Sequence, residues 1–168
     1  IARKASNQLN SDVVLVGILP TIQHSDLTTE NLTPLPRYHE LNRILTELHG
    51  SDRHVRIKGL DELLLTLPDA LSETCNTSFQ LHLQVNPKDL VNAYNWSQAI
   101  AAPVLASAVN SPMLFGRRLW HETRLALFQQ STDTRSVVHQ ARNQIPRVTF
   151  GRDWVRGSIL EIFHEDVA

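Results

Sequence analysis

The sequence predicts an α+β fold, in which a largely antiparallel sheet carries helices packed on one face. Two kinds of periodicity predict it. Several short segments alternate apolar and polar residues, as strands do, and longer segments repeat apolar residues every three to four positions, as helices do. The composition, 42% hydrophobic and 20% charged in 168 residues, is that of an ordinary globular protein. We therefore expect residues 1–168 to form a single domain.

The charge balance indicates which partners are not expected, and the cysteine count indicates the compartment. Sixteen Lys and Arg against seventeen Asp and Glu give a formal net charge of -1, so no overall field attracts phosphate backbones or anionic membranes. No apolar run approaches the roughly twenty residues of a membrane-spanning helix, and the N-terminal residues lack the apolar core of a signal peptide. Cys75 is the only cysteine, which fits a reducing compartment. We expect a cytoplasmic protein without nucleic-acid or membrane partners.

The first elements are a helix end, a buried strand and a helix. The opening IARKASNQLN has helical spacing and no initiator methionine, so we expect a partial domain from a longer protein. Residues 13–19 form a continuous apolar run that suits a strand covered on both faces, and Pro20 then opens a polar loop. Apolar residues next recur at i, i+3, i+7 and i+10, which predicts an amphipathic helix over Pro36–His49 with Gly50 as its C-cap.

Two short elements follow. Residues 54–58 alternate and place Val55 and Ile57 on one face, which predicts a strand. Residues 60–67 are rich in leucine and predict a short helix that Pro68 ends.

The most regular alternation lies in residues 78–85, SFQLHLQV, which predict a strand. One face is apolar, and the other carries Gln80, His82 and Gln84. A solvated strand face usually carries Lys, Glu or Thr, whereas an imidazole between two amides can donate, accept and bind a metal. The polar face therefore suits a ligand-binding cleft, and a solvated face with an incidental histidine is the alternative.

A long helix and an arginine-rich segment come next. Residues 88–109 predict a helix that bends near Pro103 and ends before Pro112. In a helical continuation, Arg118 and Glu122 would form an i,i+4 pair. Planar guanidinium groups bind phosphate or carboxylate through two hydrogen bonds, so the segment is a candidate anion site, and solvated arginines are the alternative. Its arginines are Arg117, Arg118, Arg124 and Arg135.

Residues 147–168 predict two strands joined across Gly151 and Gly157. The last strand would place Glu161 among apolar residues. A carboxylate there is costly without a cation or strong donors, so Glu161 needs a partner, either a metal or an arginine.

Several of these segments, taken in order, resemble one family. They are residues 17–21 (GILPT), Pro36-Arg37-Tyr38, TSFQLHLQV, the long helix that ends in Asn-Ser-Pro, FGRR with the following Glu-Thr-Arg, and SILEIFHED. The combination resembles the glutamate-cysteine ligase family of the bacterial carboxylate-amine ligase type, which has a glutamine synthetase-like fold. The similarity extends from about Val13 to Asp166.

The resemblance implies an ATP-dependent ligase that phosphorylates a carboxylate, such as the side chain of glutamate, and lets an amine attack the acyl phosphate. Magnesium ions would bridge the phosphates, and the reaction would belong to glutathione biosynthesis. By motif, His82 and Glu161 correspond to metal ligands. Arg124 corresponds to a catalytic arginine that binds the transferring phosphate or the substrate carboxylate.

The other candidate residues follow from these assignments. The candidate cofactor-binding residues are Gln80, Gln84, Arg117, Arg118 and Arg135. We expect the polar face of residues 78–85 to share a cleft with Glu161. We also expect Arg124→Ala to weaken ligand binding by about 2 kcal/mol, the value of a charge-assisted pair.

Departures from the family pattern limit these expectations. Ile18 and Leu19 stand where the family loop has Thr and His, Phe163 stands where the ligand strand has Arg, and no glutamate-rich strand precedes residue 13. Such a site would bind Mg²⁺ weakly, so either a preceding segment supplies carboxylates or the site has degenerated. We expect the 168-residue chain alone to be inactive, whereas a longer parent protein would be the ligase and could include a regulatory domain.

Two other functions are open. A noncatalytic relative or regulatory domain that binds a nucleotide or an amino acid would keep the arginines and lose metal ligands. A metal hydrolase built on His82, Glu161 and His164 is disfavoured, because residues three apart in a strand face opposite sides.

Overall fold

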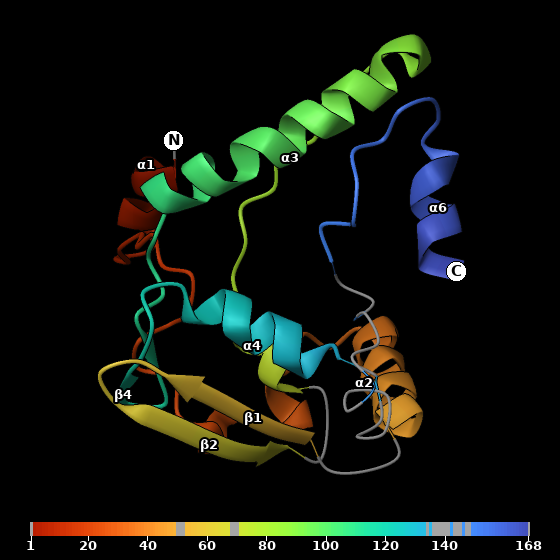
Figure 1. The fold of residues 1–168 in the computed structure, drawn as a ribbon. Coiled ribbons are helices and arrows are strands. Elements are labelled where there is room, and N and C mark those ends of the chain that lie inside the picture. The colour runs from red at the N-terminus through yellow and green to blue at the C-terminus, as the bar shows by residue number, and fades with distance from the viewer. Residues whose placement is uncertain are drawn as a thin grey trace.

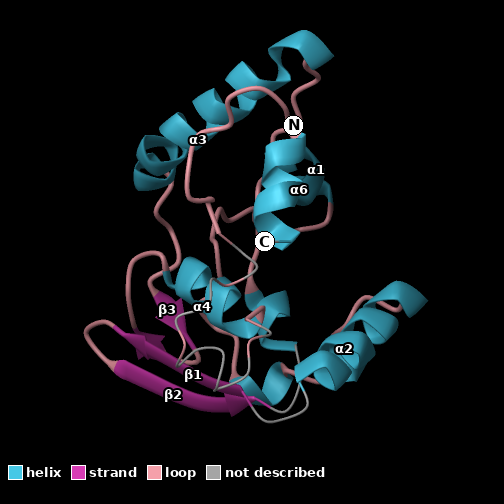
Figure 2. Cartoon of the chain, turned by 45° about the vertical axis from the view of Figure 1, so that its right-hand side comes forward, coloured by secondary structure: helices cyan, strands magenta, loops and turns pink. Residues whose placement is uncertain are grey.

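A computed structural model of the chain describes residues 2–49, 53–67, 71–133, 135, 142, 146 and 149–167. The fold class is α+β, as predicted, because two antiparallel two-stranded sheets accompany the helices. Sheet β1-β2 lies beside α4, whereas α3 runs at a distance from this layer (Figure 1). Figure 2 shows the same separation from a second direction. The helices and strands are α1 (Ala2–Gln8), α2 (Pro36–His49), β1 (Arg53–Lys58), β2 (Glu62–Leu67), α3 (Leu90–Ser107), β3 (Met113–Leu114), β4 (Arg117–Arg118), α4 (Thr123–Ser131) and α6 (Leu160–Val167). Four short 3-10 helices complete the described elements: η1 (His24–Asp26), η2 (Thr29–Asn31), η3 (Leu71–Cys75) and η4 (Pro87–Asp89).

The hydrophobic core lies between sheet β1-β2 and α4. Strand β1 buries Val55 and Ile57 on one face, which confirms the alternation predicted for residues 54–58. Helix α4 contributes Leu127, and the β3-β4 hairpin contributes Leu114, both fully buried. Burial of such side chains, each worth about 2 kcal/mol, is what stabilises this part of the fold.

The helix predicted for residues 60–67 is wrong, because the segment forms strand β2. It pairs with β1 in antiparallel register, with Ile57 opposite Leu63 and Val55 opposite Leu65. Its burial alternates, so that Leu63 and Leu67 face the core while Leu64 is exposed. A leucine-rich run has no strict period of its own, and the register with β1 decides which leucines are buried.

Two further predicted strands do not form in the described residues. In residues 13–19, only Gly17 and Ile18 are buried, and Ile18 forms a single antiparallel bridge with Asn76. Residues 78–85 have no regular structure, and Phe79 is 92% exposed. A strand needs a neighbour that satisfies its backbone groups, and no described segment supplies one to residues 78–85.

The helical predictions succeed at α1, α2 and α3. Helix α2 begins and ends as predicted, and Gly50 lies outside the described residues. Helix α3 contains Pro103 and ends two residues before the predicted end, with Ala108 as its C-cap. None of its described residues is buried, so α3 is a largely solvated element. No helix in the described ranges is long and apolar enough to span a membrane.

The last predicted strand is also wrong, because residues 160–167 form α6. The strand predicted before Gly151 lies partly outside the described residues, and residues 149–159 contain no strand. The reason lies at the start of this helix and concerns Glu161 directly, as described below.

Candidate functional site

Segments that are far apart in the sequence meet around Arg124, in the first turn of α4. The N–H of Gly17 donates to the carbonyl of Asn110 at 3.1 Å, and the N–H of Thr77 donates to the carbonyl of Gly17 at 2.9 Å. The Arg124 guanidinium reaches the carbonyl of Thr77 through Nη1 at 3.4 Å. We call these residues, together with Ser111 and Glu122, the Arg124 cluster. It joins the loop at residue 17, the start of the TSFQLHLQV segment, the Asn-Ser-Pro turn and the Glu-Thr-Arg segment.

A buried ion pair lies at the centre of the Arg124 cluster. Arg124 Nε donates to Glu122 Oε2 at 2.7 Å, and the side chains are 20% and 3% exposed. Glu122 also accepts the N–H of Asn110 at 3.0 Å and the hydroxyl of Ser111 at 3.4 Å. A buried carboxylate with this many donors is well compensated, and it orients the guanidinium.

The cluster has almost no free space on the side of Gly17. A Cβ at Gly17 would lie 2.7 Å from Asn110 Oδ1 and 2.9 Å from Arg124 Cδ, so a larger residue would displace the guanidinium. Asn110 Oδ1 is buried and accepts no hydrogen bond from the described residues. Buried acceptors of this kind are usually satisfied by water or a ligand, so the cluster has an unused acceptor beside its cation.

The predicted pair of Arg118 with Glu122 is wrong, because residue 118 lies in β4 and not in a helix. Arg118 instead binds Asp61 in the β1-β2 turn, with its backbone N–H 2.8 Å and its Nε 3.5 Å from Oδ2. These bonds, the backbone N–H first, lower the pKa of Asp61. Arg117 is exposed on the same strand.

The other predicted cofactor-binding residues lie elsewhere. Arg135 pairs with Asp133 through Nε at 2.8 Å and Nη2 at 2.5 Å. Gln80 and Gln84 are exposed, and Gln80 Oε1 lies 3.3 Å from His82 Nε2. In the described part of the chain, no hydrogen bond or ion pair joins these residues to the Arg124 cluster, so their binding roles stay predictions.

Glu161 caps α6. Its carboxylate accepts the backbone N–H groups of Arg156 at 3.0 Å, Gly157 at 2.7 Å and Ser158 at 2.8 Å. Ser158 Oγ in turn accepts the N–H of Leu160 at 3.2 Å. Ser158 and Glu161 therefore form a capping box, and the Ser-x-x-Glu spacing before an apolar run is the sequence signal that predicts a helix here. The strong donor set that Glu161 needs is the backbone of its own helix start.

The pKa of Glu161 is expected to lie below its usual value of 4.5 in an NMR titration, because the N–H groups of Arg156, Ser158 and Gly157 favour the ionised carboxylate. Because this pKa is lower in the folded than in the unfolded chain, the ionised carboxylate stabilises the folded state at pH values above the pKa of the unfolded chain. This stabilisation is lost as the pH falls through the pKa of the folded chain. Helix α6 should therefore fray in acid, as measured by amide chemical shifts. Glu161→Ala should abolish this acid transition, and an unshifted pKa in the unaltered chain would contradict the capping role.

No group of three or more His, Cys, Asp or Glu side chains that could bind a metal occurs within the described ranges. Residues 161 and 164 lie three apart in helix α6 and share one face, so the strand geometry that was expected to separate Glu161 from His164 is wrong. The metal-binding roles of His82 and Glu161 stay predictions, as does their shared cleft. The two strands on which that cleft depends do not form in the described residues.

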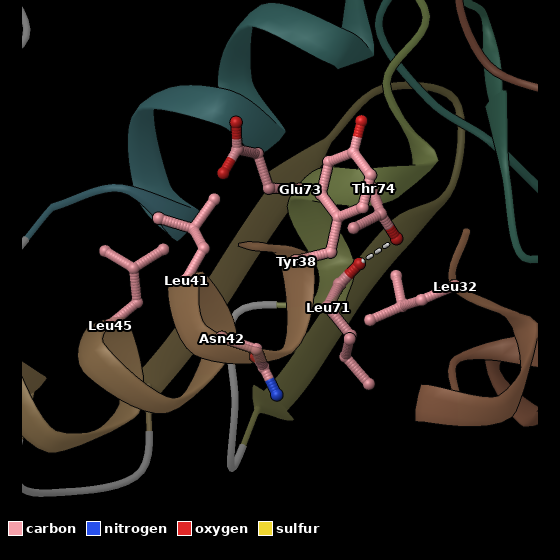
Figure 3. A pocket seen from close by; sticks show the side chains of 8 residues that line it. All are labelled: Leu32, Tyr38, Leu41, Asn42, Leu45, Leu71, Glu73 and Thr74. Carbon is pink, nitrogen blue, oxygen red and sulfur yellow. Dashed lines mark hydrogen bonds between the residues drawn. The ribbon is translucent and has the colours of Figure 1, made fainter. Parts of the chain in front are cut away.

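A small groove lies between α2 and η3 (Figure 3). Its free volume of about 40 Å³ can contain a few water molecules, which is far too little for a nucleotide. The groove is lined by Leu32, Tyr38, Leu41, Asn42, Leu45, Leu71, Glu73 and Thr74.

Cys75, at the end of η3, is buried, and burial raises the pKa of its thiol to about 11. The thiol therefore stays protonated near neutral pH, and Cys75 is a core residue and not a nucleophile.

Comparison with known proteins identifies the family. The model of glutamate-cysteine ligase family 2 matches residues 2–150, a range that includes every segment of the Arg124 cluster. No curated protein and no solved structure gives a significant match. Because the match spans most of the 168 residues, the chain belongs to glutamate-cysteine ligase family 2.

Proposed function

We propose that the chain is the substrate-binding part of an ATP-dependent carboxylate-amine ligase of the glutamate-cysteine ligase type. Its substrates would be a glutamate-like amino acid and an amine, joined through an acyl phosphate in the cytoplasm. The observation that carries this proposal is the Arg124 cluster, because segments 17, 77, 110–111 and 122–124 lie within the family match and meet at one partly exposed guanidinium.

The guanidinium of Arg124 is suited to binding an anion. Its Nε is used by Glu122, which orients the group, while the side chain retains 20% exposure through which a ligand can reach it. An oriented cation of this kind stabilises charge that develops on a transferring phosphoryl group or a substrate carboxylate. The unused acceptor of Asn110 lies on the same side of the cluster as Gly17 and could receive a hydrogen bond from a ligand or a water molecule.

Membership of the family implies ATP and Mg²⁺. The described residues are better suited to bind a phosphate or carboxylate group than to bind Mg²⁺. Mg²⁺ requires several oxygen ligands in octahedral geometry. The Glu161 carboxylate already accepts three backbone N–H groups, and the imidazole of His82 lies beside an amide and not a carboxylate. His82 and Glu161 therefore do not form a Mg²⁺ site in this arrangement, and the metal-binding roles proposed for them depend on the family resemblance alone. Proposed nucleotide contacts are Gln80, Gln84, Arg117, Arg118 and Arg135.

Arg124→Lys tests the proposed anion site. Lysine keeps the positive charge beside Glu122 but lacks the planar fork, so ATP or glutamate should bind about tenfold more weakly in calorimetry, the equivalent of about 1.4 kcal/mol. Arg43→Ala on α2 is the matched control, because Arg43 pairs only with exposed Glu40 and Glu47 in the described structure. Equal binding by the unaltered chain and Arg124→Lys, with circular dichroism unchanged, would exclude Arg124 from the site.

A noncatalytic relative that binds a nucleotide or an amino acid is the second candidate function. The observation that favours it is the lack, among the described residues, of any three clustered metal-binding side chains. Phosphate release from ATP separates the two functions. Release that requires both glutamate and an amine indicates a ligase. Binding without release is expected of a noncatalytic binding domain and equally of an inactive part of a ligase, so only release decides between the two functions.

A further inference from the structure

The guanidinium of Arg124 has donors that the protein does not use. Its Nε donates to Glu122 Oε2 at 2.7 Å, and its Nη1 donates to the carbonyl of Thr77 at 3.4 Å. A guanidinium carries five N–H donors, and in the described part of the chain no hydrogen bond from Nη2 is found. At least one N–H on each of Nη1 and Nη2 is therefore left for a ligand, which is enough for the paired hydrogen bonds that a carboxylate makes.

The backbone N–H groups at the start of α4 are already used within the protein. Helix N-termini bind phosphate through such groups when they are free. Here Ser111 accepts the N–H of Thr123 at its carbonyl, at 3.2 Å, and the N–H of Arg124 at its Oγ, at 3.3 Å. The N–H of Leu125 donates to the carbonyl of Glu122 at 3.0 Å. Because these three donors are occupied, an anion at the start of α4 depends on the Arg124 side chain.

The charge of the Arg124 cluster also limits which anion it can bind. Glu122 is 3% exposed and lies against the guanidinium, so the ion pair as a whole is neutral. The attraction of Arg124 for an anion is offset by the repulsion of Glu122, and this repulsion grows with the charge of the anion. A phosphate group carries a charge of about -2 and three acceptor oxygens, so it is penalised more than a carboxylate with a single charge. The uncharged members of the cluster are Gly17, Thr77, Asn110 and Ser111.

We propose that the Arg124 cluster binds a carboxylate in preference to a phosphate, and that Glu122 is the residue that determines this specificity. The proposal rests on the proposed function, in which Arg124 binds an anion, and it assigns that anion to the carboxylate substrate. Glu122 acts in two ways: it occupies Nε, which leaves Nη1 and Nη2 for the ligand, and its charge opposes a ligand of higher charge. The nucleotide phosphates would then bind at other residues of the ligase.

Titrations of the 168-residue chain with glutamate and with inorganic phosphate test the proposal. The NMR signal of the Arg124 Nε–H group reports binding at this site alone. In the unaltered chain, glutamate should bind there at least about tenfold more tightly than phosphate, and an equal concentration of phosphate should not displace it. Glu122→Gln removes the buried charge and keeps an acceptor for the N–H of Asn110, so the preference for glutamate should fall at least about tenfold.

Two further variants separate the charge of Glu122 from its structural contacts. Ser111→Ala is the matched control, because it removes the hydroxyl that lies 3.4 Å from Glu122 Oε2 and keeps the charge, so the ratio of the two affinities should not change. Thr77 is exposed, so Thr77→Lys adds a positive charge near the guanidinium without altering the ion pair. This variant should lower the preference for glutamate as Glu122→Gln does, and it supplies the test if Glu122→Gln does not fold.

The outcomes separate this proposal from the proposed function. An Arg124 signal that responds to neither glutamate nor phosphate would overturn both the anion site and its specificity. A signal that responds to phosphate at least as tightly as to glutamate would keep the anion site and overturn its assignment to a carboxylate. A preference for glutamate that is unchanged in both Glu122→Gln and Thr77→Lys would overturn the role of Glu122.

Discussion

Arg124→Ala is expected to lower the free energy of unfolding by about 3 kcal/mol, with a fall in Tm of about 10 °C. The alanine removes the cation that lies 2.7 Å from Glu122 Oε2 and leaves a carboxylate that is 3% exposed without its charge partner. The loss in free energy of unfolding comes from the uncompensated buried charge and not from the lost attraction. It therefore exceeds the loss expected when a surface ion pair is removed. Thermal and urea denaturation measure it.

A second substitution separates this cause from a simple loss of packing. Adding Glu122→Gln to Arg124→Ala removes the buried charge while the amide can still accept from Asn110 N–H and the Ser111 hydroxyl, so part of the stability should return. Arg43→Ala is again the control, and its effect should be much smaller because Arg43 and its partners are exposed. An Arg124→Ala variant as stable as Arg43→Ala would contradict the buried ion pair.

Gly59→Ala is expected to destabilise the protein by about 3 kcal/mol through steric overlap alone. Gly59 follows β1, and a Cβ there would lie 2.1 Å from the carbonyl carbon and 2.4 Å from the Cα of Leu119. Both atoms belong to the backbone, so the β1-β2 turn must separate from the segment after β4. That movement stretches the bond from Asp61 N–H to the carbonyl of Arg118, 2.8 Å long, and the reciprocal bond to the Asp61 carboxylate.

Gly157→Ala is the matched comparison for this substitution. The nearest atom to a Cβ at Gly157 is Glu161 Oε1 at 3.4 Å, which is ordinary contact, so this variant should unfold at nearly the same urea concentration as the unaltered chain. If Gly59→Ala were equally harmless, the close approach of the turn to Leu119 would be wrong.

Local sequence patterns were sufficient to predict the elements whose backbone hydrogen bonds close within the segment itself. The helix over residues 36–49 closes its hydrogen bonds within the segment, so periodicity and the opening proline predict it. Strand β1 was predicted because Val55 and Ile57 alternate with charged residues. The capping box at Ser158 and Glu161 was an equally local signal, and it outweighs the apolar residues that suggested a strand.

The contacts of the Arg124 cluster could not be predicted from local sequence patterns. The Glu-Thr-Arg segment identifies Arg124 as an anion-binding candidate, but its spacing carries no sign that Glu122 is buried or that Gly17 and Thr77 lie beside it. Those contacts join residues separated by up to about a hundred positions, and they depend on how the loop, the turn and α4 pack together.

The sequence by itself determined the family, the α+β class, the three helices α1 to α3, strand β1 and the candidate role of Arg124. Only the tertiary structure decided that residues 62–67 pair as a strand, that residues 78–85 are unpaired, and that Arg118 binds Asp61. The physical reason is the range of the interactions. Helices and caps satisfy their backbone groups within a few residues, whereas a strand or a buried ion pair exists only when a distant segment supplies its partner.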